Sequence, residues 1–123
     1  MTDNMTVVRV NSKLEETYAK ITELQERWEN ININDTQKWS NQGAHFNRQL
    51  KNMLYLAKVM TKGALMRNES RGAHYKPDFP ERDDENFLKT TMAKFDPATG
   101  EPIITYQDVD VSLIPPRKRD YSK

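Results

Sequence analysis

The chain has 123 residues, enough for one modest core, and it is polar, with 36% hydrophobic residues, 30% charged residues and a mean hydropathy of -0.92. Its 19 basic and 18 acidic residues give a net charge of +1, so no overall field attracts nucleic acid and no nucleic-acid partner is expected. The absence of cysteine excludes disulfides, thiolate-ligated metal clusters and a cysteine nucleophile.

The first predicted element is a helix that begins at Ser12. Ser12 and Glu15 have the spacing of a capping box, in which the hydroxyl and the carboxylate each satisfy a free amide of the first turn. Apolar residues then recur every three or four positions and form one stripe: Leu14, Tyr18, Ile21, Leu24, Trp28 and Ile31. This stripe requires a second face to pack against.

A second, longer helix is predicted from about residue 37 to residue 69, with Asp35 or Thr36 as its N-cap. Its apolar positions repeat at helical spacing: Phe46, Leu50, Met53, Leu54, Ala57, Met60, Ala64 and Leu65. We expect these residues to form the core between the helices.

Residues 1–10 are predicted to be the end of a third helix whose beginning is missing, because Met5, Val7, Val8 and Val10 supply apolar positions and two helices alone make a poor core. The chain is therefore expected to be a piece of a larger protein.

Residues 67–86 have few apolar side chains and many charges of both signs. Arginine pairs bidentately with carboxylates, so Arg67, Arg71 and Arg82 among nearby acids suggest an ion-pair network that fixes a loop. A flexible charged loop is the alternative that composition alone leaves open.

Two strands are predicted at residues 87–95 and 103–109, where β-branched and aromatic residues flank a turn at residues 96–102. A helix competes for residues 87–94, because Asp83 or Asp84 precedes them as a cap. The tail beyond residue 110 is expected to be extended.

No catalytic or cofactor-binding cluster is predicted in this chain. The two histidines, His45 and His74, are too few for a zinc site, and the four glycines lie too far apart for a phosphate-binding turn. Ser70 and His74 lack the orienting acid and oxyanion hole of a hydrolase. We expect no metal, no catalytic residue and no directly bound cofactor.

The charged region nevertheless resembles a known family. Residues 67–75 contain Arg67, Glu69, Ser70, Arg71, Gly72, Ala73 and His74 in an unbroken run. Residues 78–89 contain Asp78, Phe79, Pro80, Arg82, Asp83, Asp84, Asn86, Phe87, Leu88 and Lys89. Together with Pro115, Pro116, Arg119 and Tyr121 near the end, they resemble the C-terminal signature of the flavoprotein subunit of succinate dehydrogenase and fumarate reductase, and most closely the succinate dehydrogenases of Bacillus-type bacteria.

The resemblance implies a mainly α fold: a three-helix, spectrin-repeat-like bundle with a truncated first helix, a long polar loop, a β-hairpin and an extended tail. Residues 1–123 would be one C-terminal domain of a larger flavoprotein, with a helical part (1–70), a charged loop (71–86), a hairpin (87–109) and a tail (110–123).

It also implies an enzyme that oxidises succinate to fumarate and passes electrons through FAD and an iron–sulfur subunit to quinone. The full-length subunit would carry FAD, and its partners would be its own FAD-binding domain, the iron–sulfur subunit and a membrane anchor, at the cytoplasmic side of a bacterial membrane. This fragment would be non-catalytic, and its charged residues would dock on the FAD-binding domain or support the flavin: Arg71, His74, Arg82, Asp83, Asp84 and Arg119.

Three alternatives remain open from the sequence. The chain could be the equivalent domain of fumarate reductase, the equivalent domain of L-aspartate oxidase, or a free-standing helical interaction module.

Overall fold

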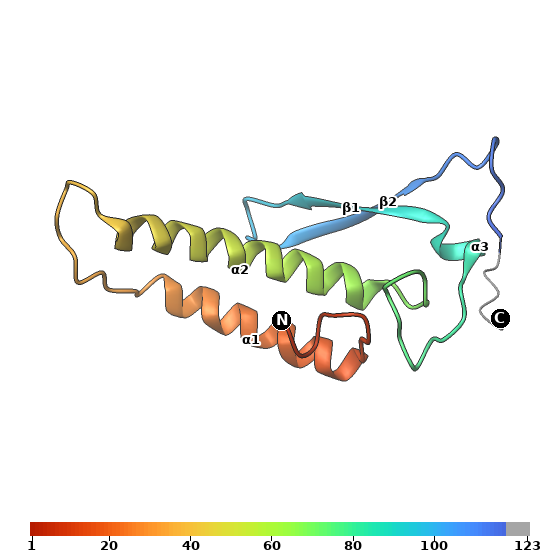
Figure 1. Cartoon of the computed structure of the whole chain (residues 1–123), viewed down its shortest axis with the longest axis horizontal. Coiled ribbons are helices and arrows are strands. Elements are labelled where there is room, and N and C mark those ends of the chain that lie inside the picture. The colour runs from red at the N-terminus through yellow and green to blue at the C-terminus, as the bar shows by residue number, and fades with distance from the viewer. Residues whose placement is uncertain (118–123) are drawn as a thin grey trace.

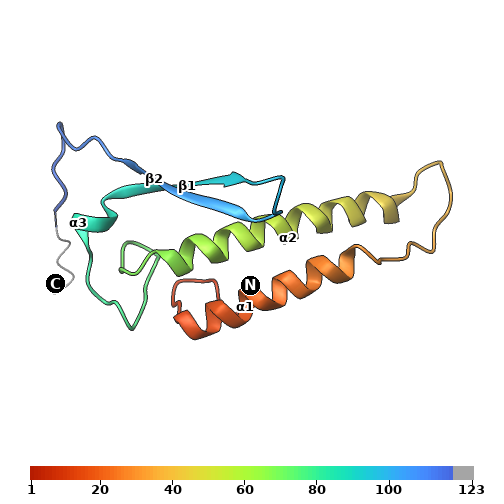
Figure 2. The ribbon, with the colours of Figure 1, turned by 180° about the vertical axis from the view of Figure 1, so that it is seen from behind.

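The computed structural model describes residues 1–117, which form two long helices and a β-hairpin stacked in layers (Figure 1). Helix α1 (Asn11–Trp28) runs antiparallel to α2 (Gln42–Met66), and strands β1 (Lys89–Phe95) and β2 (Pro102–Asp108) lie on the side of α2 away from α1. Figure 2, from behind, shows the same layering, with the short helix α3 (Asp84–Phe87) beside the end of the hairpin. The predicted mainly helical class with a hairpin is confirmed.

Helix α1 begins one residue earlier than predicted, and the predicted capping box is wrong. Val10 is the N-cap residue and makes no side-chain capping bond, while the amide of Leu14 donates to the carbonyl of Val10 at 3.0 Å. Two residues of the predicted apolar stripe, Leu14 and Ile21, are buried as expected. Ile31 lies beyond the helix and is exposed.

Helix α2 begins five residues later than predicted, because Asn41 rather than Asp35 or Thr36 is its N-cap. The Asn41 side chain accepts from the amide of Ala44 at 2.8 Å and donates to the carbonyl oxygens of Asp35 and Gln37. One amide side chain therefore both starts the helix and ties back the preceding loop, which leaves residues 37–41 outside the helix.

The predicted N-terminal helix is not formed, and α2 ends at Met66 rather than near residue 69, so residues 1–10 and 67–70 of the predicted helical part (1–70) are not helical. These residues make turns and a single parallel bridge between Val8 and Tyr75. The amide of Tyr75 donates to Val7 at 3.0 Å, and the amide of Arg9 donates to Tyr75 at 2.8 Å. The pairing partner that the sequence could not indicate is Tyr75, which lies 66 positions or more away in the charged loop.

The hairpin prediction is confirmed. β1 and β2 pair antiparallel from Lys89 opposite Asp108 to Phe95 opposite Pro102. In the turn, Asp96 accepts from the amides of Ala98 and Gly100, and Gly100 has a φ of 70°, a conformation that favours glycine. The competing helix is limited to α3, which Asp83 caps by accepting from the amide of Asn86 at 3.0 Å.

The predicted core along α2 is only partly buried. Leu54 and Ala64 are buried, but four other predicted core residues are exposed: Phe46 60%, Leu50 40%, Met53 63% and Met60 54%. Leu50, Met53 and Leu54 line a groove of about 470 Å³ with Ile21 and Leu24 of α1. The groove and the exposed stripe share Leu50 and Met53, and we call the stripe of Phe46, Leu50, Met53, Ala57 and Met60 the open face.

A buried polar contact joins the turn of the hairpin to both helices. Glu101 follows Gly100 in the turn; its Oε1 lies 2.5 Å from Nζ of Lys58, whose side chain is 5% exposed. The hydroxyl of Tyr18 on α1 donates to Oε2, and Nζ of Lys62 lies 3.7 Å from the same oxygen. Burial opposes ionisation of Glu101, but the bonds from Lys58 and Tyr18 outweigh it and lower the pKa of this carboxyl. The carboxylate thus positions the hairpin over α2.

Candidate functional site

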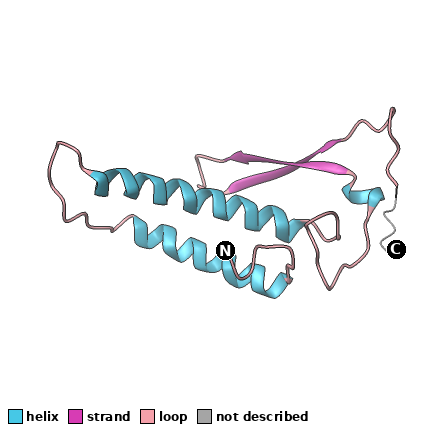
Figure 3. Ribbon diagram, in the orientation of Figure 1, coloured by secondary structure: helices cyan, strands magenta, loops and turns pink. Residues whose placement is uncertain are grey.

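The candidate site is the charged loop together with the residues just before it, so from here on the charged loop means residues 67–86. It leaves the end of α2 and returns through α3 to β1 (Figure 3). A two-residue turn opens it, in which Arg71 and His74 exchange backbone hydrogen bonds of 2.8 and 3.0 Å. Gly72 occupies this turn with a φ of 59°, which explains a glycine at this position of the motif.

Glu69 is the centre of the loop. It is fully buried, and its carboxylate accepts four hydrogen bonds: from Nε of Arg67 at 3.1 Å, from Nε and Nη2 of Arg71 at 2.9 and 3.0 Å, and from the amide of Asp83 at 3.0 Å. A buried carboxylate is tolerated only when it is paired and hydrogen-bonded in this way. The predicted ion-pair network is therefore present.

A second carboxylate extends the network to the surface. Asp84 lies 2.6 Å from Nη2 of Arg71 through Oδ1 and 2.6 Å from Nη2 of Arg82 through Oδ2. The Arg71 hydrogen bond, with that of Arg82, lowers the pKa of Asp84. Arg82 also donates to the carbonyl of Arg117 at 2.8 Å, so the network reaches the tail. Arg119 lies outside the described residues.

Asp83 has a different role from the ion pairing that was expected. Its carboxylate accepts from the amide and the side chain of Asn86, and the side-chain bond lowers its pKa most. It caps α3, and its backbone rather than its carboxylate meets Glu69 and Arg71.

Arg67 was predicted to belong to the ion-pair network but not to the docking residues, and it also joins the loop to the hairpin. Its guanidinium donates to the carbonyl of Phe87 at 2.6 Å and to that of Lys89 at 2.9 Å, in addition to Glu69. The only signal for this role in the sequence is its place at the start of the motif.

His74 connects the loop to the N-terminal segment. Its Nδ1 lies 2.6 Å from Nη1 of Arg9, which can only donate, and its Nε2 lies 3.0 Å from the carbonyl of Arg67. His74 is therefore a neutral ring with its hydrogen on Nε2. Burial first, and the charges of Arg9, Lys76 and Arg67 next, lower its pKa.

Lys76 is fully buried, which the sequence did not indicate. Its ammonium donates to the carbonyl of Leu65 at 3.1 Å, near the end of α2, and to Oδ1 of Asn68 at 3.0 Å. Burial lowers the pKa of Lys76 to about 8. A cation at this position satisfies a terminal carbonyl of α2 and complements the helix dipole.

Ser70 is part of the loop's scaffold. Its hydroxyl donates to the carbonyl of Phe79 at 2.7 Å and accepts from the amide of Lys76 at 2.9 Å, while the His74 ring bonds to Arg9 and to the carbonyl of Arg67. Within residues 1–117 no three His, Asp or Glu side chains converge in a way that could hold a metal ion. Over the same range, neither long helix has the length and apolar character needed to cross a bilayer.

These features define a mainly helical fold with a β-hairpin, in which ion pairs and hydrogen bonds hold the charged loop together. A family model described as fumarate reductase flavoprotein C-term matches residues 1–121, and the chain belongs to this family.

Two relatives and one solved structure place it further. The chain is 68% identical over its whole length to the succinate dehydrogenase flavoprotein subunit of Bacillus subtilis, of which it covers 21%. It is 38% identical over 98% of its length to the fumarate reductase flavoprotein subunit of Escherichia coli, of which it covers 20%. A structure of a mutant E. coli quinol fumarate reductase superposes with a TM-score of 0.86 at 38% identity, covering 91% of this chain and 19% of that one. The chain thus spans about a fifth of the length of its relatives.

Proposed function

We propose that residues 1–123 are one domain, the C-terminal domain of a succinate dehydrogenase flavoprotein subunit, which oxidises succinate to fumarate. The observation that carries this proposal is the 68% identity to the B. subtilis subunit along the entire chain, against 38% for the fumarate reductase subunit of E. coli. Fumarate reductase is the second candidate, because the superposed structure is a quinol fumarate reductase.

The chemistry would lie outside these residues. The chain has no glycine-rich dinucleotide turn, so its residues do not fit a role in holding FAD directly, and we derive no flavin step from them. FAD would be carried by the rest of the subunit, and electrons would pass to an iron–sulfur subunit and a membrane anchor. The complex would sit at the cytoplasmic side of the membrane.

The charged loop is proposed to dock on the FAD-binding domain. Arg71 donates hydrogen bonds to Glu69 and Asp84, and Arg82 donates one to Asp84. The loop would therefore dock as a preformed surface rather than through free charges. Preorganisation of this kind lowers the entropy cost of association. The proposed docking or flavin-supporting residues are Arg71, His74, Arg82, Asp83, Asp84 and Arg119.

The open face is proposed to be covered by another helix of the same subunit, which would complete a three-helix bundle. Its apolar residues on α2 follow spacings of four and three, with Phe46, Leu50, Met53, Ala57 and Met60 along one side. This is the repeat with which a helix packs against a neighbouring helix.

The docking proposal is tested in the full-length subunit with Arg82→Ala and Arg119→Ala, and with Arg27→Ala on the exposed side of α1 as the matched control. We expect reduced flavin content and weaker assembly with the iron–sulfur subunit in the first two variants only. Arg82 is preferred to Arg71 because Arg71 contacts the buried Glu69, and its loss would disturb the fold itself. Wild-type flavin content and assembly in both variants would overturn the docking role.

A further inference from the structure

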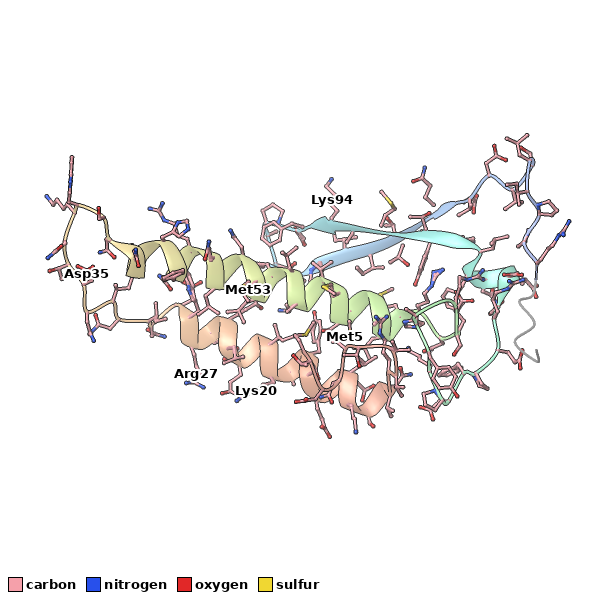
Figure 4. The ribbon with its side chains drawn as sticks, viewed as in Figure 1. Met5, Lys20, Arg27, Asp35, Met53 and Lys94 are labelled. Carbon is pink, nitrogen blue, oxygen red and sulfur yellow. The ribbon has the colours of Figure 1, made fainter. Side chains whose placement is uncertain are left out.

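An open cavity of about 310 Å³ lies between the N-terminal segment, the end of α2 and the hairpin. Three basic side chains, Arg9, Arg67 and His74, line it together with apolar side chains that include Met5, Met60 and Ile104. Met5, labelled in Figure 4, lies between α1 and the second half of α2. Apolar walls with a few convergent polar groups are the usual character of a small-molecule site.

Among the described residues that line this cavity, Arg9 carries a positive charge that no carboxylate neutralises. Its Nε donates to the carbonyl of Thr6 at 2.8 Å, and its Nη1 donates to Nδ1 of His74 at 2.6 Å. Within residues 1–117 it has no carboxylate partner, and burial alone lowers the pKa of its guanidinium. Since a guanidinium has five N–H groups, its Nη2 edge retains donors that the described residues do not use.

The groups around Arg9 reinforce the positive potential. Lys76 is a buried cation from the charged loop, and its nearest bonds are to neutral oxygens of Leu65 and Asn68. Arg67, at the end of α2, is paired with Glu69 and bonded to Phe87 and Lys89, so its charge is compensated while that of Arg9 is not. The charges of Arg9, Lys76 and Arg67 all act on His74 in the same direction.

We propose that this cavity binds a small carboxylate with a short apolar body. The carboxylate would pair with the free edge of Arg9, and the apolar body would lie against Met5, Met60 and Ile104. A guanidinium edge matches the two oxygens of a carboxylate. A phosphate would have to place more charged oxygen against the apolar walls, which costs desolvation.

The test is an NMR titration of the 123-residue chain with butyrate, with butyramide as its uncharged counterpart of similar shape. We expect saturable shifts at Arg9, Met60 and His74 with a dissociation constant on the order of 1 mM. Butyramide is expected to bind at least tenfold more weakly. Bound butyrate is also expected to raise the pKa of His74, because an anion stabilises its charged form.

Two variants locate the site. Arg9→Gln is expected to weaken butyrate binding at least tenfold, whereas Arg27→Gln, on the exposed outer side of α1 (Figure 4), is expected to bind as the wild type does. The wild-type shift map decides the matter independently if Arg9→Gln does not fold. Any one of three results would overturn the proposal: no saturable shift at millimolar butyrate, equal binding of butyramide, or shifts confined to residues outside the cavity.

Discussion

Arg71 forms a bidentate pair with the buried carboxylate of Glu69, with Nε 2.9 Å from Oε1 and Nη2 3.0 Å from Oε2. The same Nη2 reaches Asp84 at 2.6 Å. Through these contacts one guanidinium connects the interior of the loop to its surface, so the loop's shape depends on a charge that is hidden from solvent.

Glu69→Gln is expected to destabilise the chain by about 3 kcal/mol, because it leaves two arginines beside a buried group that no longer carries a charge. The free energy of unfolding from urea denaturation measures this loss. Glu23→Gln, which removes an exposed partner of Lys20 and Arg27, is the matched control and should cost much less than Glu69→Gln, because solvent screens exposed ion pairs. Equal losses in the two variants would show that the Glu69 network does not hold the loop.

The contact of Glu101 with Lys58 is expected to show coupling in a double-mutant cycle. Glu101→Gln leaves the buried ammonium of Lys58 without a full counter-charge and should cost about 2–3 kcal/mol. Lys58→Met in the same background should recover part of this loss, with a coupling energy of about 1–2 kcal/mol from urea unfolding. Additive effects of the two changes would show that Glu101 and Lys58 do not stabilise each other.

Two glycines are expected to respond in opposite directions to alanine. Gly63 lies inside α2, and an added Cβ would meet only the Thr91 methyl at 3.7 Å, so Gly63→Ala should stabilise the chain by about 0.5–1 kcal/mol. Gly100 has a positive φ, so Gly100→Ala should destabilise it by about 1 kcal/mol despite open space around it. Thermal unfolding of the pair compares them directly, and a shift of the same sign in both would refute the conformational argument.

The sequence predicted the features whose signals are local. The hairpin followed from the Asp96 to Gly100 turn chemistry between β-branched runs, and the two long helices followed from apolar spacing. The start of α2 was misplaced because Asp35, Thr36 and Asn41 are all good N-caps, and only the folded loop shows that Asn41 bonds in both directions.

Contacts between distant residues could not be predicted. Arg9 and His74 are 65 positions apart, and nothing in either local pattern indicates their hydrogen bond or the strand-like pairing around it. The motif located the charged loop, but composition could not tell that Glu69 would be buried while Asp84 remained partly exposed. Helical spacing likewise predicted that Met53 and Met60 belong to an apolar face, and could not tell that these residues leave that face uncovered.

Burial of the His74 ring, together with its contact with Arg9, is expected to make stability depend on pH. Because the pKa of His74 is lowered from 6.5 in the folded chain, the unfolded chain binds more protons as the pH falls, and its free energy decreases relative to the folded state. The stabilisation is fully present above pH 6.5 and is lost as the pH falls below it. After solvent screening of this half-buried ring, we expect a loss of about 0.5–1 kcal/mol between pH 7.5 and 5.5. Asp83 and Asp84, whose pKa values are lowered from 3.8, stay ionised across this window.

His74→Gln should flatten this pH dependence, because glutamine offers an acceptor to Arg9 and a donor to Arg67 without titrating. His45→Gln is the control, since the exposed His45 contacts Gln49 and Phe46 on α2 and does not touch Arg9, so this variant should keep the dependence that His74 produces. Urea unfolding of the three proteins at pH 7.5 and 5.5 gives the comparison. If His74→Gln keeps the wild-type slope while His45→Gln loses it, the pH dependence arises at the far end of α2 and the role assigned to the Arg9 contact is wrong.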